Sequence, residues 1–247
     1  MAERHDQGGA QVVKVSVRGG EICIAQQPGS GNLGTSVWDA SVILVHYLND
    51  NSKQFNQRTM DGKRVLELGA GCGLAGIYCA TLGADVTLTD LEPVLPILNQ
   101  NARRNLGGMP ESVKYKVQEY CWGNPVDALD APYDYIIACD CVYVESLVEV
   151  LVWSLEQLAG ASTTVVVCRH VHTSKLVDLS TSTLLTIPAV RASCAVRSYR
   201  SEHADLLFCK RKRNTAAPPQ LAQHASEGEQ PAAALHPATK SLRAEED

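Results

Sequence analysis

The stretch VLELGAGCGLAG, residues 65–76, decides the fold class of this chain. A short apolar run breaks into glycines at every second position, and a second apolar run follows. A strand, a glycine turn and a helix in this order let a ligand approach the backbone and direct helix N–H groups toward it. The next apolar run ends on Asp90, where a carboxylate can accept hydrogen bonds from ribose hydroxyls. The pattern predicts nucleotide-type binding, and a tight strand–helix turn without a ligand is the alternative.

The alternation of strand and helix continues along the chain. Further strands are expected within residues 85–90, 113–123, 133–140 and 163–170, and helices within 74–83, 94–105 and 144–158. The last two β-type runs, 189–199 and 204–212, predict an antiparallel closing pair. Because the strands are largely apolar and alternate with helices, they indicate a parallel sheet covered on both faces. The sequence therefore predicts an α/β fold.

The segments at the two ends of the chain differ from this pattern. Two β-type runs, residues 12–17 and 21–26, surround an Arg-Gly-Gly turn and predict a hairpin ahead of the sheet. Polar residues 1–10 are predicted to be flexible. Residues 214–247 are rich in Ala, Pro, Gln and Glu and are predicted to be disordered. The expected domain spans residues 11–213.

Composition narrows the classes of function. With 45% hydrophobic and 20% charged residues, the 247-residue chain matches a soluble globular protein. Its net charge of -5 gives no argument for a nucleic-acid partner. No apolar run approaches the roughly 20 residues of a membrane span, and the N-terminus lacks an apolar signal core. The nine cysteines include no C-x-x-C pair, so we expect no metal site and a reduced, intracellular protein.

The glycine turn fits two cofactors. GCGLAG, residues 71–76, satisfies the dinucleotide fingerprint, although the strand already breaks at Gly69. ELGAGCG, residues 67–73, resembles the first motif of the seven-β-strand S-adenosylmethionine (SAM) methyltransferases. Glu67 can meet the cationic amino group of the methionine portion, which a nicotinamide cofactor lacks. The antiparallel closing pair and DCVY, residues 140–143, favour the methyltransferase.

Four segments stand in the order of one family, which the chain resembles over about residues 12–210. They are VWDASVILVHYL (37–48), VLELGAGCGLAG (65–76) with TLTD (87–90), YCWG (120–123) and DCVY (140–143). The resemblance is to family 16 of the seven-strand methyltransferases, which includes lysine methyltransferases acting on Hsp70 chaperones and on valosin-containing protein. It implies a Rossmann-like, seven-stranded and mostly parallel sheet, SAM as cofactor, and methyl transfer to a lysine ε-amine of a protein, such as a chaperone or an AAA ATPase. A monomer is implied too, located in the cytoplasm and also in the nucleus.

The resemblance also implies residue roles. The expected cofactor-binding residues are Trp38, Glu67, Gly69, Ala70, Gly71, Asp90, Trp122 and Cys139. Within that set, Trp38 would line the pocket, Asp90 would hold the ribose and Trp122 would cover the adenine. Asp140 and Tyr143 are the expected catalytic residues, because they would face the incoming amine.

Alternatives stay open for these residues and for the function. Both tryptophans could be core residues, Asp90 and Asp140 could be helix N-caps, and Tyr143 could be a buried aromatic. The chain could methylate a non-protein or non-lysine acceptor, or it could be a catalytically silent SAM-binding module. An Asn-Pro-Pro-Tyr loop, which suits planar amide or adenine nitrogens, is absent, and this favours an aliphatic amine.

Overall fold

The computed structural model describes the greater part of the chain, in five pieces. They are residues 3–7, 10–141, 144–170, 197–200 and 204–210. The predicted catalytic residue Tyr143, the segment directly after β8 and the tail predicted to be disordered lie outside the described residues. Within the described residues the strands form two sheets, one of three strands and one of seven.

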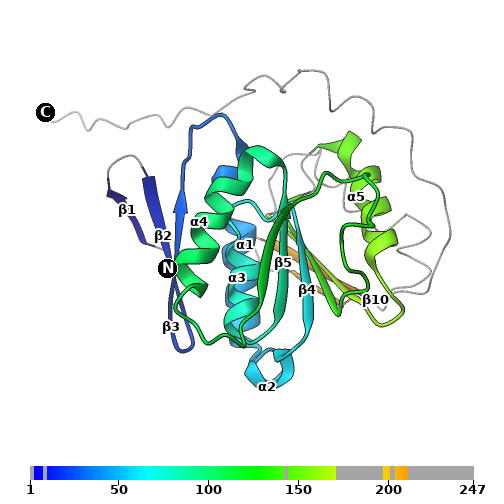
Figure 1. The fold of residues 1–247 in the computed structure, drawn as a ribbon, viewed down its shortest axis with the longest axis horizontal. Helices are drawn as coiled ribbons and strands as arrows, with labels where there is room; N and C mark the ends of the chain where they lie inside the picture. Colours follow the sequence, from blue (N-terminus) through cyan, green and yellow to red (C-terminus); the bar gives the residue numbers. More distant parts are fainter. Residues whose placement is uncertain (1–2, 8–9, 142–143, 171–196, 201–203, 211–247) are drawn as a thin grey trace, which may run out of the picture.

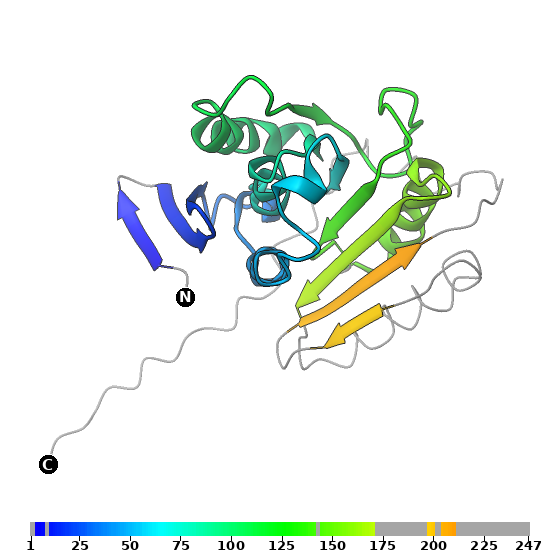
Figure 2. The same cartoon turned by 90° about the horizontal axis from the view of Figure 1, so that it is seen from below.

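The seven-stranded sheet is the centre of the fold (Figure 1). Its strands are β4 (Arg64–Leu68), β5 (Asp85–Asp90), β6 (Tyr115–Glu119), β7 (Tyr135–Cys139), β8 (Thr164–His170), β9 (Arg197–Arg200) and β10 (Ala204–Lys210). The spatial order is β6-β5-β4-β7-β8-β10-β9. The first five strands pair in parallel, and β10 pairs antiparallel with both β8 and β9. Figure 2 shows β8, β10 and β9 side by side, so the predicted parallel sheet with an antiparallel closing pair is confirmed.

Helices cover both faces of this sheet. On one face lie α1 (Asp39–Asp50), α3 (Leu74–Thr81) and α4 (Leu95–Leu106), and on the other lies α5 (Glu145–Leu158). The short helix α2 (Gln57–Met60) and the turns η1 (Leu33–Thr35) and η2 (Glu92–Val94) lie in connections. Along β4, Leu66 and Leu68 pack in the cluster that contains α5, while Val65 packs in the cluster of α1, α3 and α4. This alternation follows from the two-residue period of a strand. The predicted helices on both faces are confirmed.

A small antiparallel sheet precedes the large one. It consists of β1 (Glu3–Gln7), β2 (Ala10–Val17) and β3 (Gly20–Gln26). The predicted hairpin corresponds to β2 and β3. The strand β1 lies in the segment predicted to be flexible, and its residues ERHDQ are all polar and show no apolar alternation. Its pairing with β2 is made by the backbone, which any sequence supplies.

The second edge of β3 is covered by two side-chain amides of α4. The Asn105 side chain accepts from Cys23 N–H at 2.9 Å and donates to Cys23 C=O at 2.9 Å. The Asn101 side chain repeats both bonds with Ala25, at 2.8 and 2.9 Å. Four helical residues rise about 6 Å and two strand residues about 6.7 Å, so the two spacings match. The amides thus fasten the small sheet to the main domain (Figure 1).

The topology identifies one edge of the large sheet as a ligand site. The chain runs outward from β4 through β5 to β6, and then returns to the other side of β4 through β7 and β8. In open α/β sheets, ligands bind outside the carboxyl ends of the strands at such a reversal. This edge is uppermost in Figure 1, opposite α2, which precedes β4. No helix in the described part of the chain has the length and apolarity that crossing a membrane requires.

Candidate functional site

Three segments of the chain pack on the glycine turn between β4 and α3. Gly69 and Gly71 have φ values of 62° and 55°, in the left-handed region that favours glycine. A Cβ atom on Gly69 would lie 2.9 Å from Cys141 Sγ and 2.9 Å from a ring carbon of Trp122. A Cβ atom on Gly71 would lie 3.0 Å from the carbonyl oxygen of Gly34. The glycines therefore permit the close approach of the chain itself at this turn.

Glu67, a predicted cofactor contact, has a structural role within the domain. It is 1% exposed, and its Oε2 accepts the N–H of Gly76 at 2.8 Å. That N–H belongs to the first turn of α3, whose N–H groups lack partners within the helix. Burial raises the pKa of Glu67 to about 8, and the bond from Gly76 opposes the rise. The carboxyl group is thus mainly neutral at pH 7 and faces α3, and its contact with a cationic amino group stays a prediction.

Asp90 connects the end of β5 to the glycine turn. Its Oδ2 accepts Gly71 N–H at 2.7 Å, and its Oδ1 accepts Leu91 N–H at 2.8 Å. Burial raises the pKa of Asp90 more than these two hydrogen bonds lower it. Each carboxylate oxygen retains a lone pair, so the group can still accept from a ligand hydroxyl. The alternative of a helix N-cap does not apply, because Leu91 is the N-cap of η2 and its side chain makes no cap bond.

The two predicted tryptophans come from different parts of the chain, one directly before α1 and one after β6. Trp38 is 43% exposed, and its indole N–H donates to Leu33 C=O at 3.0 Å, so it is not a core residue. Trp122 is half-buried, with its ring over Gly69. The segment that carries it is anchored to α5, because Gly123 N–H donates to Ser154 Oγ at 2.8 Å. The Trp122 ring therefore borders the turn, and a pocket-lining role for both tryptophans stays a prediction.

The predicted cofactor contact Cys139 ends β7 next to two other thiols. Its partner in the register of β8 is Cys168, whose thiol donates to Ala40 C=O at 3.1 Å. The hydrogen bond with Cys168 and burial raise the pKa of Cys139 well above its usual range. The thiol of Cys141 donates to Leu68 C=O at 3.3 Å, and burial raises its pKa too. The thiols at this edge fill space and donate weak hydrogen bonds, and are not activated nucleophiles.

Asp140, the predicted catalytic carboxylate, follows β7 at the carboxyl edge of the sheet. Among the described residues it alone combines a side chain with a positive φ, 54°. Its N–H donates to Cys168 C=O at 2.7 Å, which holds the strand end in register while the chain turns. A left-handed conformation in a non-glycine residue is often associated with functional sites. Asp140 does not cap α5, because the N-cap is Val144 and its side chain makes no cap bond.

Sequence reasoning missed Asn101, which supports the turn from behind. Asn101 is 0% exposed, and besides its bonds to β3 it donates to Cys72 C=O at 3.0 Å. One amide thus links α4, the small sheet and the glycine turn. A signal was present, since Asn101 falls in the apolar stripe formed by Ile97, Leu98 and Ala102. A polar residue on the buried face of a helix requires hydrogen-bond partners.

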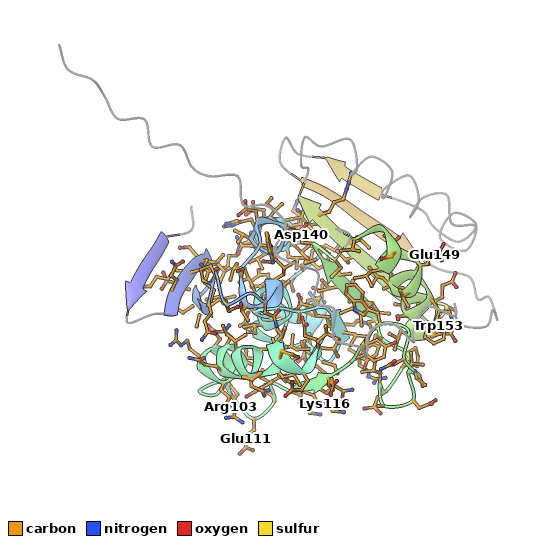
Figure 3. All side chains as sticks on the ribbon, turned by 90° about the horizontal axis from the view of Figure 1, so that it is seen from above. Arg103, Glu111, Lys116, Asp140, Glu149 and Trp153 are labelled. Carbon is orange, nitrogen blue, oxygen red and sulfur yellow. The ribbon has the colours of Figure 1, made fainter. Side chains whose placement is uncertain are left out.

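The described residues contain no group of three or more His, Cys, Asp or Glu side chains that could hold a metal ion. The two predicted carboxylates lie at the carboxyl edge of the sheet, Asp90 at the end of β5 and Asp140 directly after β7. Between those strands lies β4 with its glycine turn. In the view of Figure 3, Asp140 lies on the opposite side of the molecule from Arg103 and Lys116. The arrangement suits a nucleoside-containing ligand beside Asp90 and a polar acceptor beside Asp140.

Comparison with known proteins gives a family match. The family model described as lysine methyltransferase matches residues 18–178. Protein N-lysine methyltransferase METTL21A of Danio rerio is 41% identical over 136 residues, 54% of this chain and 59% of that protein. EEF1A lysine methyltransferase 3 of Xenopus tropicalis is 34% identical over 149 residues, 60% of this chain and 62% of that protein. The matched part of the chain thus spans about three fifths of the length of these curated relatives.

The fold also recurs among solved structures. The 16S rRNA N2 G1207 methyltransferase RsmC of T. thermophilus, in complex with AdoMet and guanosine, superimposes with a TM-score of 0.59. It is 18% identical, and the match covers 83% of this chain and 52% of that one. This likeness establishes the fold alone.

Proposed function

This chain belongs to the lysine methyltransferase family, and from that premise we propose that it transfers a methyl group from SAM to the ε-amine of a lysine in a protein substrate. The observation that carries the proposal is the arrangement of Asp90 and Asp140 on the two strands that flank β4 and its glycine turn. The first carboxylate suits a ribose and the second an amine.

The residues around the turn fit SAM. The buried carboxylate of Asp90 can accept ribose hydroxyl hydrogen bonds, and the next residue, Leu91, is 50% exposed and offers an apolar surface for a purine. Trp122 borders the same turn, and the exposed Trp38 bonds to Leu33, next to Gly34, which meets the turn. SAM supplies an electrophilic methyl group on a sulfonium when it is bound. For Glu67 we propose that it holds α3 against the turn rather than contacting the cofactor.

The protein's task is to position an uncharged amine and exclude water. At pH 7, deprotonating a lysine with a pKa of about 10.4 costs roughly 4.6 kcal/mol. A nearby cation and a dry environment lower that pKa, whereas an ionised Asp140 beside the ammonium raises it. We therefore assign Asp140 the capture and orientation of the amine. We also propose that Tyr143 borders the path by which the lysine side chain approaches the methyl group.

The variants Asp140→Asn and Asp140→Gly test the assignment of the amine. Both residues tolerate a left-handed backbone, so the free energy of unfolding should change by no more than about 1 kcal/mol. Methyl transfer should fall at least about tenfold in both variants, while the dissociation constant of S-adenosylhomocysteine stays unchanged. Isothermal calorimetry and transfer of labelled methyl measure the two quantities separately. Unchanged transfer in both variants would exclude this role for Asp140.

The variant Asp90→Asn tests the cofactor assignment. The amide oxygen can still accept Gly71 N–H, but the negative charge that favours ribose hydroxyl donors is lost. Hydrogen bonds to charged groups contribute about 1.5–3 kcal/mol, so the affinity for S-adenosylhomocysteine should fall about tenfold or more. Wild-type affinity in a folded variant, judged by circular dichroism, would contradict the assignment.

The substrate can be identified directly. The protein, incubated with labelled SAM and a cell extract, should transfer label to a protein band, and mass spectrometry of that band should place the methyl group on a lysine. We propose a chaperone or an AAA ATPase as first candidates, and elongation factor EEF1A because a relative's name carries it. Label on nucleic acid or on small molecules alone would favour a different acceptor. We further propose that the chain acts as a monomer, which light scattering tests.

A further inference from the structure

The exposed large apolar side chains gather at the edge that carries the candidate site. Among the described residues they are Leu33, Trp38, Leu91 and Leu147, with exposed fractions between 37% and 52%. The connection between β3 and α1 brings the first two to the glycine turn, where Gly34 C=O accepts the Cys72 thiol at 3.7 Å. Leu91 follows Asp90, and Leu147 lies in the first turn of α5. Exposed apolar groups that cluster around a site indicate a contact surface.

The same edge is acidic. Four acidic residues besides Asp90 stand on described parts of this edge: Asp39 at the start of α1, Glu92 in η2, Asp140 after β7 and Glu149 in α5, and residues 27–39, 90–94 and 144–149 contain no lysine or arginine. The basic residues of the described part lie mainly at other places, such as Lys63 and Arg64 at the amino end of β4. Glu92 and Asp140 follow β5 and β7, the two strands that flank β4, and the connection that precedes Asp39 reaches the glycine turn at Gly34. The site edge thus combines apolar side chains with negative charge.

We propose that this edge docks a protein segment in which the target lysine is flanked by further lysines or arginines and by an apolar residue. The proposal rests on the proposed function, because it names the sequence class of the lysine substrate. A surface of one sign attracts a segment of the opposite sign over about 8 Å at physiological salt, and the attraction raises the association rate. The apolar side chains supply the short-range contact. The acidic rim also repels acidic segments and so selects against them.

Binding of two matched peptides to the full chain tests the proposal. The first is a fluorescent peptide with a central lysine flanked by arginines and one leucine, and the second has glutamates in place of the arginines. In about 50 mM salt the basic peptide should bind at least about tenfold more tightly, and the difference should shrink severalfold at about 300 mM. Equal binding of the two peptides, or no saturable binding of the basic one, would overturn the proposal.

Charge reversal at two exposed sites provides a matched control. Glu149, on α5 near the site edge, and Glu111, before β6, are both exposed and are labelled apart in Figure 3. Glu149→Lys should weaken binding of the basic peptide about threefold to tenfold, whereas Glu111→Lys, with the same change in net charge, should leave it unchanged. Leu147→Ser should weaken binding at high salt as well. If both reversals weaken binding equally, the net charge of the protein alone explains its preference for the basic peptide. That result would refute docking at this edge.

The two proposals can fail separately. If labelled methyl reaches a protein lysine in the extract but both peptides bind equally, the docking proposal fails and the enzymatic one stands. If the basic peptide binds with the predicted dependence on Glu149 but no methyl group is transferred to protein, docking stands and the enzymatic proposal fails. Affinity for S-adenosylhomocysteine, measured on each variant, shows whether the cofactor site is intact.

Discussion

The free energy of unfolding of a Glu67→Gln variant is expected to stay nearly constant between about pH 4.5 and pH 8. That of the wild-type protein should fall over the same range. Burial raises the pKa of Glu67 from 4.5 to about 8 in the folded state. Between these values the folded chain retains a proton that the unfolded chain has released, so stability falls as pH rises. The loss begins above the unfolded pKa and is complete above the folded one. Its size is on the order of 5 kcal/mol, at 1.36 kcal/mol per unit.

Urea unfolding at a series of pH values measures this effect. Glutamine preserves the oxygen that accepts Gly76 N–H and carries no charge at any pH, so the variant should be the more stable protein above about pH 8. The control Glu92→Gln removes an exposed carboxylate, and surface changes of this kind alter stability by about 0.5 kcal/mol or less. Parallel stability curves for wild type and Glu67→Gln would show that the buried carboxyl group does not hold its proton.

Asn101→Ala should destabilise the protein by about 3–5 kcal/mol, and Asn105→Ala by only about 1–2 kcal/mol. Loss of the Asn101 amide leaves the N–H and C=O of Ala25 and the C=O of Cys72 without partners in a fully buried position. Each buried, unsatisfied group costs about 1–3 kcal/mol. Asn105 is only partly buried, and its bonds to the small sheet involve Cys23 alone.

The same pair of variants separates fastening of the small sheet from support of the cofactor turn. Both side chains bond to β3, but only Asn101 bonds to the turn. The affinity for S-adenosylhomocysteine should therefore fall severalfold in Asn101→Ala and remain unchanged in Asn105→Ala. If the alanine variant fails to fold, Asn101→Asp can replace it, because aspartate can accept from Ala25 N–H but cannot donate to Cys72 C=O. Its affinity for S-adenosylhomocysteine should again fall below that of Asn105→Ala. Equal losses of affinity in the Asn101 and Asn105 variants would exclude a specific role for Asn101.

The sequence predicted the main sheet because its physical signals are local. Each parallel strand is a short apolar run, and each helix has its own periodicity and end signals, so Val65–Leu68 and Asp85–Asp90 could be placed without tertiary information. The positions of Asp90 and Asp140 followed from the same runs, because the residue that ends a parallel strand lies at the ligand edge. The comparison with relatives then confirmed the family resemblance.

Features that depend on contacts distant in sequence could not be predicted. The motif predicts a ligand contact for Glu67, whereas its burial and its bond from Gly76 become visible only when α3 packs on β4. The β1 strand is polar and acquires its structure by pairing with β2. The bond of Asn101 to Cys72 joins residues 29 positions apart. The sequence indicates only that Asn101 is a polar residue in an apolar stripe, and nothing in it identifies Cys72 as its partner.

The rates at which the buried thiols at the site edge react with a reagent can report local opening of the native protein. Cys72 meets the β3–α1 connection at Gly34, Cys141 meets the end of β4 at Leu68, and Cys168 meets α1 at Ala40. A thiol reagent can reach each sulfur only after its junction separates, so the rate of labelling reports how often that junction opens. The three rates, resolved by mass spectrometry, would rank the three junctions by their local stability. The native cysteines suffice for this, so no substitution has to be introduced.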